Sequence, residues 1–325
     1  MFWRGGTYVL RAIMALGVVL GLVLLTACGN ESAGEVTGVP SDSPVASAAT
    51  IGRADAEAVF GTLKGLDDAW KREDCAEIGR LTAWAESTLG RRACEAGRAA
   101  PSVGGYGDAE FFLPATGDDE DGAWFVALAR HPKPAYFVFV QEDGGWRLGA
   151  GPIPVVGDAP ELQGEVEAAG QEPGSALRAK LTPTRHVAFL TDAAGVSGVR
   201  FASGDPMRAL LAELVRAPAR VRPDRLTTDV RLEGPARALA LPGGAALVFH
   251  VLRVVFTQKP GSGRSTLAHP RYGAADVRSF AGDSRPGEIT GSELVFLATE
   301  VSKDNRMRTV AMRRVLADIA AGDSE

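Results

Sequence analysis

The first regular hydrophobic pattern in the chain lies within residues 54–72. Apolar side chains recur there every three or four positions, at Val59, Leu63, Leu66 and Trp70. Residues with this spacing lie on one face of a helix, so the pattern predicts an amphipathic helix. A second helix is predicted over residues 74–88, with an apolar face formed by Ile78, Leu81 and Trp84.

The pattern then changes to short apolar runs in close succession, at residues 109–115, 123–130, 135–142 and 146–150. The connectors between the last three runs, HPKP and DGG, have the composition of tight turns. Strands joined by short turns are antiparallel neighbours, so these runs predict an antiparallel meander.

The second half of the chain repeats this order of elements. A helix is predicted from Thr182 to about Thr191, and a clearer one over residues 203–218. In the clearer helix, Asp205 can cap the N-terminus, Pro206 takes the first helical position and Pro218 ends the helix.

Strand patterns follow at 225–234, 236–241, 246–258, 292–301 and 306–316. The last run alternates apolar and polar residues until Arg313 and Arg314 break the alternation. Its pattern therefore leaves strand and helix open for residues 306–319.

In each half of the chain, predicted helices are followed by predicted antiparallel strands. This order predicts an α+β fold with two domains, each with N-terminal helices packed on an antiparallel sheet. The predicted domains are residues 51–160 and residues 171–325. The Trp70 helix, the second helix and the ending GGWRLGAGPIP give the first domain a resemblance to the nuclear-transport-factor-type cone fold, also called cystatin-like. Enzymes of that family place an acid–base pair inside the cone.

The N-terminus has the pattern of an export signal. Arg4 and Arg11 precede an apolar run over residues 12–25, which is too short for a spanning helix. The sequence LTAC, ending at Cys28, resembles the lipobox of bacterial lipoproteins, in which the cysteine is acylated and begins the mature chain. The prediction is a signal peptide at 1–27 and a flexible, Ser-, Gly- and Pro-rich tether at 28–50. A chance cysteine after another kind of signal is the alternative.

The exported chain as a whole, over about residues 25–320, also resembles a group of actinobacterial, Streptomyces-type lipoproteins. That resemblance implies a cell-envelope protein, palmitate or a similar acyl chain on Cys28, and no established activity. Because acylation occupies Cys28, Cys75 and Cys94 remain as an even pair among the three cysteines. In an oxidising compartment the two predict a disulfide, and two reduced, buried thiols are the alternative.

Candidate chemistry is sparse. The four histidines are not spaced as metal ligands, and the sequence predicts no catalytic residue, no metal and no cofactor. His250 lies inside an apolar strand and is expected to be a satisfied core or sheet-face residue. Trp84, Trp124 and Phe137 are candidates for lining an apolar pocket, with an ordinary hydrophobic core as the alternative.

Charge differs between the two halves. Residues 51–160 contain 11 basic and 18 acidic residues, whereas residues 171–325 contain 22 basic and 16 acidic ones. Arginines cluster at 216, 220, 222 and 225, and again at 306, 308, 313 and 314. The domains could dock through these charges, the basic domain could contact an anionic envelope component, or the arginines could form a solvated surface. Nucleic acid is not an expected partner outside the cell.

The sequence therefore favours a lipid-anchored protein on the extracytoplasmic face of the cell membrane. The favoured function is a non-enzymatic binding or interaction module of the envelope. Two alternatives stay open: a cone-fold isomerase or hydrolase with a pocket in one domain, and a solute-capture lipoprotein. An enzyme would require ionisable groups converging in one pocket.

Overall fold

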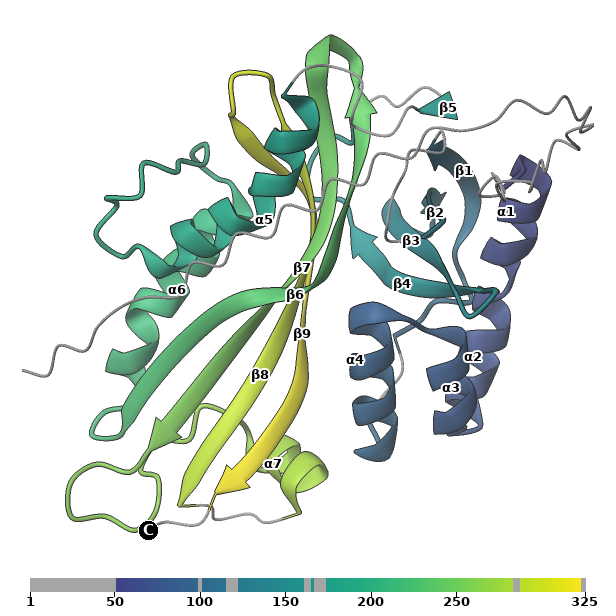
Figure 1. Ribbon diagram of the computed structural model, residues 1–325. Coiled ribbons are helices and arrows are strands. Elements are labelled where there is room, and N and C mark those ends of the chain that lie inside the picture. Colours follow the sequence, from purple (N-terminus) through teal and green to yellow (C-terminus); the bar gives the residue numbers. More distant parts are fainter. Residues whose placement is uncertain are drawn as a thin grey trace, which may run out of the picture. The chain divides into compact units, whose positions relative to one another are not determined.

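The computed structural model describes residues 51–98, 101–114, 122–160, 165–166, 174–282 and 287–322. These residues belong to one compact unit. The predicted signal peptide, Cys28 and the tether lie outside the described residues. The predicted α+β class is confirmed, because helices cover two mainly antiparallel sheets (Figure 1).

The N-terminal helices are shorter than predicted. The pattern over 54–72 forms two helices, α1 (Arg53–Gly61) and α2 (Leu63–Lys71). The predicted helix over 74–88 is wrong in extent, because α3 (Cys75–Leu81) ends before α4 (Trp84–Glu95) begins. The chain is extended between them: Ala83 donates its backbone N–H to the carbonyl of Leu148, 2.8 Å away. This strand-like pairing interrupts the helix and separates Trp84 from the face that holds Ile78.

The predicted meander is confirmed in strands β1 (Gly107–Pro114), β2 (Trp124–His131), β3 (Ala135–Glu142) and β4 (Gly145–Pro154). Each pairs antiparallel with the next, and β5 (Glu165–Val166) adds a parallel edge beside β1. The register places Phe125 opposite Phe139, and their rings stack with centroids 4.9 Å apart.

The helices of the second half have different bounds from those predicted. Helix α5 (Ser175–Thr191) begins before Thr182 and keeps Pro183 inside, and α6 (Pro206–Arg220) continues past Pro218. The buried face of α5 includes Thr182, Pro183 and His186. Because these residues are polar or proline, a search for regularly spaced apolar residues does not detect the full length of the helix. Asp205 caps α6 as predicted, accepting a hydrogen bond from the backbone N–H of Met207 at 2.9 Å.

The second sheet contains β6 (Arg225–Leu241), β7 (Ala245–Lys259), β8 (Glu288–Val301) and β9 (Met307–Gly322), in that order. The predicted strands 225–234 and 236–241 are one strand with a bulge, and a short 3-10 turn, η1 (Pro242–Gly244), leads into β7. Of the undecided residues 306–319, all but Arg306 belong to a strand, β9. Helix α7 (Ala274–Ala281), between β7 and β8, has no counterpart among the predicted elements.

Three hydrophobic clusters define four layers. Helices α1–α4 pack on one face of the first sheet, and α5 and α6 pack on one face of the second (Figure 1). The remaining faces of the two sheets pack on each other through a shared core. In that core Tyr136 of β3 meets Phe249 of β7 edge to face, with ring centroids 5.4 Å apart. Because β2 and β3 are buried on both faces, they consist of continuous apolar runs.

Candidate functional site

A cavity of about 240 Å³ lies where α4 contacts β4 and the edge strand β9. We call it the α4–β9 cavity. Its walls are mainly apolar and include Leu66, Trp70, Ile78, Leu89, Leu148 and Leu316. A buried ion pair, Glu86 of α4 with Arg313 of β9, forms part of the same lining. The cavity is therefore shaped by residues from both halves of the chain.

Glu86 is the buried carboxyl group of this cavity, with only 4% of its surface exposed. Its Oε1 accepts hydrogen bonds from the backbone N–H of Gly151, at 3.0 Å, and from Nη2 of Arg313. Its Oε2 accepts none from any described residue. Burial raises the pKa of Glu86, and the Arg313 charge and the Gly151 N–H oppose that rise.

Gly151 holds this arrangement together through its backbone. Its N–H donates to Glu86, and its carbonyl accepts from Nη1 of Arg313 at 3.1 Å. Its φ is 148°, and a Cβ there would lie 2.7 Å from Cδ1 of Phe137. Only glycine fits this position, because a side chain would be strained by the backbone and would also collide with the ring.

Arg313 is fixed on a third side by an aromatic ring. Its guanidinium carbon lies 4.0 Å from the centroid of Phe296 in the neighbouring strand β8. Both Nη atoms donate hydrogen bonds, while the buried Nε has no partner in the described part of the chain. Removing one member of such a pair leaves an uncompensated buried charge and costs about 3–5 kcal/mol.

A more open pocket of about 490 Å³ adjoins the cavity and shares Arg98, Arg314, Val315 and Leu316 with it. Two arginines and two glutamates form a network in it. Arg314 donates to Glu213 at 2.5 and 2.8 Å and also to Glu293, and Arg271 lies 3.1 Å from each glutamate. The hydrogen bonds from Arg314 lower the pKa of Glu213 to about 2. This carboxylate is a stable anion and therefore a poor proton-transfer group near neutral pH.

The three predicted pocket residues do not converge. Trp84 and Trp124 lie on the side of the first sheet that faces the second sheet, and Arg237 of β6 fills the space beside them. Its guanidinium carbon is 5.3 Å from the Trp84 ring centroid and 5.9 Å from that of Trp124. Phe137 points to the opposite face, under the helices. All three belong to hydrophobic cores or pack against them.

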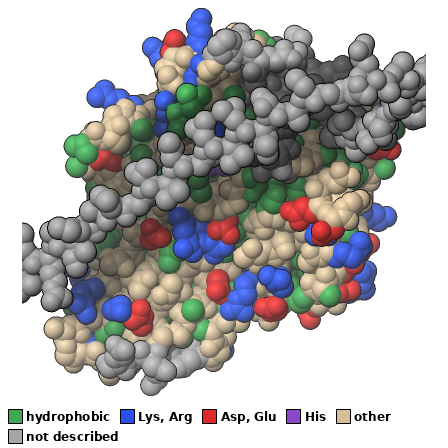
Figure 2. All heavy atoms as spheres, viewed as in Figure 1, with side chains coloured by type: hydrophobic (Ala, Val, Ile, Leu, Met, Phe, Trp, Pro, Cys, Tyr) green, Lys and Arg blue, Asp and Glu red, His purple; other side chains and the backbone are tan. Residues whose placement is uncertain are grey.

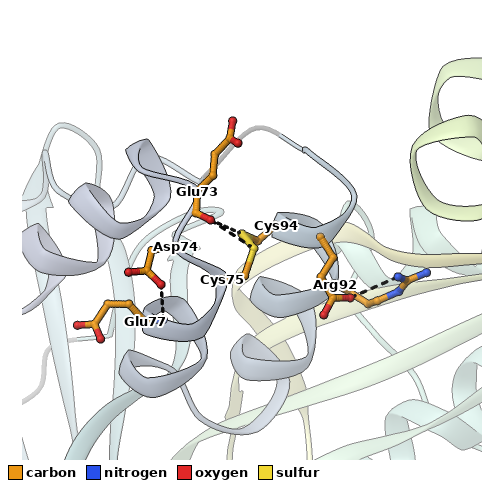
Figure 3. Close-up of a disulfide and its surroundings, with 7 residues drawn as sticks. Glu73, Asp74, Cys75, Glu77, Arg92 and Cys94 are labelled. Atoms are coloured by element: carbon orange, nitrogen blue, oxygen red, sulfur yellow. Dashed lines mark hydrogen bonds and ion pairs between the residues drawn. A yellow bond between two sulfur atoms is a disulfide. The ribbon is translucent and has the colours of Figure 1, made fainter.

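The predicted disulfide between Cys75 and Cys94 is confirmed, with a Cα–Cα distance of 5.6 Å. Figure 3 shows it joining the start of α3 to the end of α4, with the backbone carbonyl of Glu73 facing both sulfur atoms. Asp74 caps α3 through the backbone N–H of Glu77, at 3.0 Å. The bridge thus fixes the helix that carries Glu86.

The two arginine clusters differ in their surroundings. Arg308 pairs with Glu300, Arg313 with Glu86, and Arg314 with two glutamates. By contrast, four arginines at the end of α6 and the start of β6 are exposed, and no ion pair joins them to another described residue: Arg216, Arg220, Arg222 and Arg225. On the face in Figure 2, acidic and basic side chains mostly lie side by side.

No known protein family matches this chain, and neither curated proteins nor solved structures give a match. The described helices include none that is both long and apolar enough to cross a membrane. Within the same residues, no group of three or more His, Cys, Asp and Glu side chains is placed to hold a metal ion.

Proposed function

We propose that this protein is an extracytoplasmic lipoprotein, anchored to the cell membrane through acylated Cys28, that binds a small, largely apolar molecule in the α4–β9 cavity. The lipobox-like sequence LTAC supports the anchor. The Cys75–Cys94 disulfide supports export, because disulfides persist in oxidising compartments.

The observation that carries the binding function is the cavity itself. An apolar cavity of about 150 Å³ in another protein stays dry and binds benzene. At about 240 Å³, the α4–β9 cavity has room for a somewhat larger molecule of one or two rings. A partly enclosed apolar space that ends on a few polar groups is the usual form of a small-molecule site.

The enzyme alternative is favoured by one feature, the raised pKa of Glu86 in an apolar setting. Acid–base catalysis of the cone-fold type uses a pair of groups. Among the described residues that line the cavity, Glu86 is the one carboxyl group, and no histidine accompanies it. Binding without turnover therefore accounts better for the site, and capture of a solute for a transporter is one form that such binding could take.

The anchor is tested by the variant Cys28→Ala in a bacterial host that processes lipoproteins. The expected result is loss of acyl labelling and release of the protein from the membrane fraction. A tether variant, Ser41→Ala, is the control and should stay membrane-bound. Retention of the Cys28→Ala protein in the membrane would refute the lipidation proposal.

Ligand binding is tested with naphthalene as the probe and thermal unfolding as the readout, because a ligand that binds only the folded state raises the melting temperature. Ala93 lines the cavity and is 8% exposed, so Ala93→Leu should fill the space. The affinity for naphthalene that follows from the melting-temperature shift should then fall at least tenfold. Ala76→Leu, on the exposed face of α3, is the matched control. A naphthalene shift that Ala93→Leu leaves unchanged would place binding elsewhere.

The four exposed arginines at the end of α6 and the start of β6, which form no ion pair with a described residue, support a second contact, with anionic headgroups or polymers of the envelope. Arg216 and Arg220 are four residues apart on one helix face. Glutamine at all four exposed positions should weaken sedimentation with phosphatidylglycerol vesicles, with a salt dependence typical of surface charge. The control removes four exposed cations of the first half: Arg53, Lys64, Arg72 and Arg91. Equal loss in both variants would argue against a specific contact.

A further inference from the structure

We infer that the α4–β9 cavity selects a neutral ligand that carries a hydroxyl group, a small phenol or alcohol whose apolar body fills the cavity and whose hydroxyl contacts Glu86. This inference rests on the proposed binding function and specifies its ligand class. It is carried by the unequal use of the two oxygens of Glu86.

The carboxyl group of Glu86 has unused hydrogen-bonding capacity. A carboxylate can accept about four hydrogen bonds, two on each oxygen. Oε1 accepts from Gly151 and Arg313, whereas Oε2 accepts from no described residue although 96% of the Glu86 surface is buried. Oε2 is not one of the fully buried side-chain atoms that lack a partner, so it keeps some exposure, and such a polar atom is normally satisfied by water or a ligand. Oε2 is therefore the polar contact that the cavity can offer to a bound molecule.

The charges around the cavity favour a neutral molecule. The negative charge of Glu86 is matched by Arg313, its ion-pair partner. The other two arginines in the lining are also paired: Arg98 with Asp276, and Arg314 with glutamates of the adjoining pocket. An anionic ligand would find no free counter-charge, and a cationic one would compete with Arg313. Either would enter a largely apolar space at a desolvation cost.

A hydroxyl group suits Oε2 in both protonation states of Glu86. It can donate to the ionised carboxylate and can accept from the protonated acid. The apolar part of the ligand would lie against Trp70, Leu89 and Leu148, which present an aromatic ring and branched side chains. At about 240 Å³, the cavity falls below the usual range of about 300–1,000 Å³ for drug-sized ligands, so a single- or two-ring body is the expected size.

The test compares three probes of one shape by calorimetry: naphthalene, 2-naphthol and 2-naphthoate. The wild-type protein should bind 2-naphthol about tenfold more tightly than naphthalene, as expected for one added hydrogen bond to a charged group. It should bind 2-naphthoate more weakly than 2-naphthol. In Glu86→Gln the ratio of the 2-naphthol affinity to the naphthalene affinity should fall at least threefold. The matched control Glu77→Gln, on the surface of α3, should keep the full preference.

Glu86→Gln leaves Arg313 without its counter-charge, so a second variant guards against misfolding. The double variant Glu86→Gln, Arg313→Gln removes both charges together and should bind naphthalene without preferring 2-naphthol. Equal wild-type affinity for naphthalene and 2-naphthol, or tightest binding of 2-naphthoate, would overturn the hydroxyl inference and leave the binding function standing. Failure of all three probes to bind would overturn the two proposals together.

Discussion

Two histidines in the core of the second half predict a loss of stability in mild acid. His186 of α5 and His250 of β7 are 0% and 5% exposed, with ring centroids 4.7 Å apart. Nδ1 of His186 lies 2.9 Å from the carbonyl oxygen of Thr182, and its Nε2 lies 3.4 Å from Oγ1 of Thr299. Neither ring nitrogen of His250 has a hydrogen-bond partner in the described residues. The expected core position of His250 agrees with the structure, but the expectation that it is satisfied is wrong, because neither ring nitrogen has a partner among the described residues.

The size of the effect follows from the pKa of His186. Burial lowers that pKa from 6.5 to about 4, and burial followed by the neighbouring His186 lowers the pKa of His250 as well. Below pH 6.5 the unfolded chain takes up protons that the folded chain excludes, so folding stability falls as pH drops from about 6.5 to about 4. At about 1.4 kcal/mol per pH unit, His186 alone accounts for roughly 3 kcal/mol.

The perturbation that tests this reasoning is His250→Leu. It removes one of the two titrating rings and two unsatisfied nitrogens, so we expect the free energy of unfolding near pH 7 to rise by about 1–3 kcal/mol. The decrease between neutral pH and about pH 4.5 should become markedly smaller than in the wild type. Urea unfolding at several pH values measures both quantities. Glu86, with its raised pKa, contributes with the opposite sign, and comparing variant with wild type removes that contribution.

The control for this experiment is His131→Gln, because the His131 side chain, at the end of β2, is 76% exposed. That variant should keep the wild-type dependence of stability on pH. If His250→Leu also kept it, the buried imidazoles would not be the groups that couple protonation to folding, and the reasoning would be wrong.

Further predictions concern covalent and steric constraints. Replacing Cys75 and Cys94 by alanine should lower stability by about 3 kcal/mol, because the bridge closes a loop between residues 19 apart; an unchanged melting temperature on reduction would contradict this. Gly291→Ala should destabilise by about 1–3 kcal/mol in denaturant unfolding, because the new Cβ would overlap the ring of Tyr272. Gly65→Ala in α2 meets no atom within 4 Å and should stabilise by about 1 kcal/mol; equal effects at both glycines would refute the steric explanation.

The sequence predicted the strands of both sheets more reliably than the packing of those strands. The apolar runs of β2 and β3 correctly indicated buried strands, but an apolar run does not say what covers each face. The second sheet covers the face that contains Trp124, and helices cover the face that contains Phe137. That choice is made by contacts between distant parts of the chain, so a local pattern could not have excluded a pocket at Trp84, Trp124 and Phe137.

The candidate site left only one local signal in the sequence. Glu86 is a charged residue in the first turn of a helix, a position that is usually exposed, and its partner Arg313 is 227 residues further along the chain. The signal was the break in alternation at Arg313 and Arg314, which left residues 306–319 undecided. Both arginines are more than half buried in ion pairs on a strand, so the interruption marked the positions where β9 lines the α4–β9 cavity.

The charge difference between the two halves does not by itself explain their docking. In the pair Glu86–Arg313 the acidic first half supplies the carboxylate and the basic second half supplies the arginine. In the pairs Arg92–Asp318 and Arg98–Asp276 the first half supplies the arginine and the second half supplies the carboxylate. Such half-exposed pairs contribute about 0–1 kcal/mol each, whereas each fully buried apolar side chain in the shared core contributes about 1.5–3 kcal/mol. Apolar burial therefore contributes more than these ion pairs to holding the sheets together. Part of the excess positive charge of the second half lies on four exposed arginines at the end of α6 and the start of β6: Arg216, Arg220, Arg222 and Arg225.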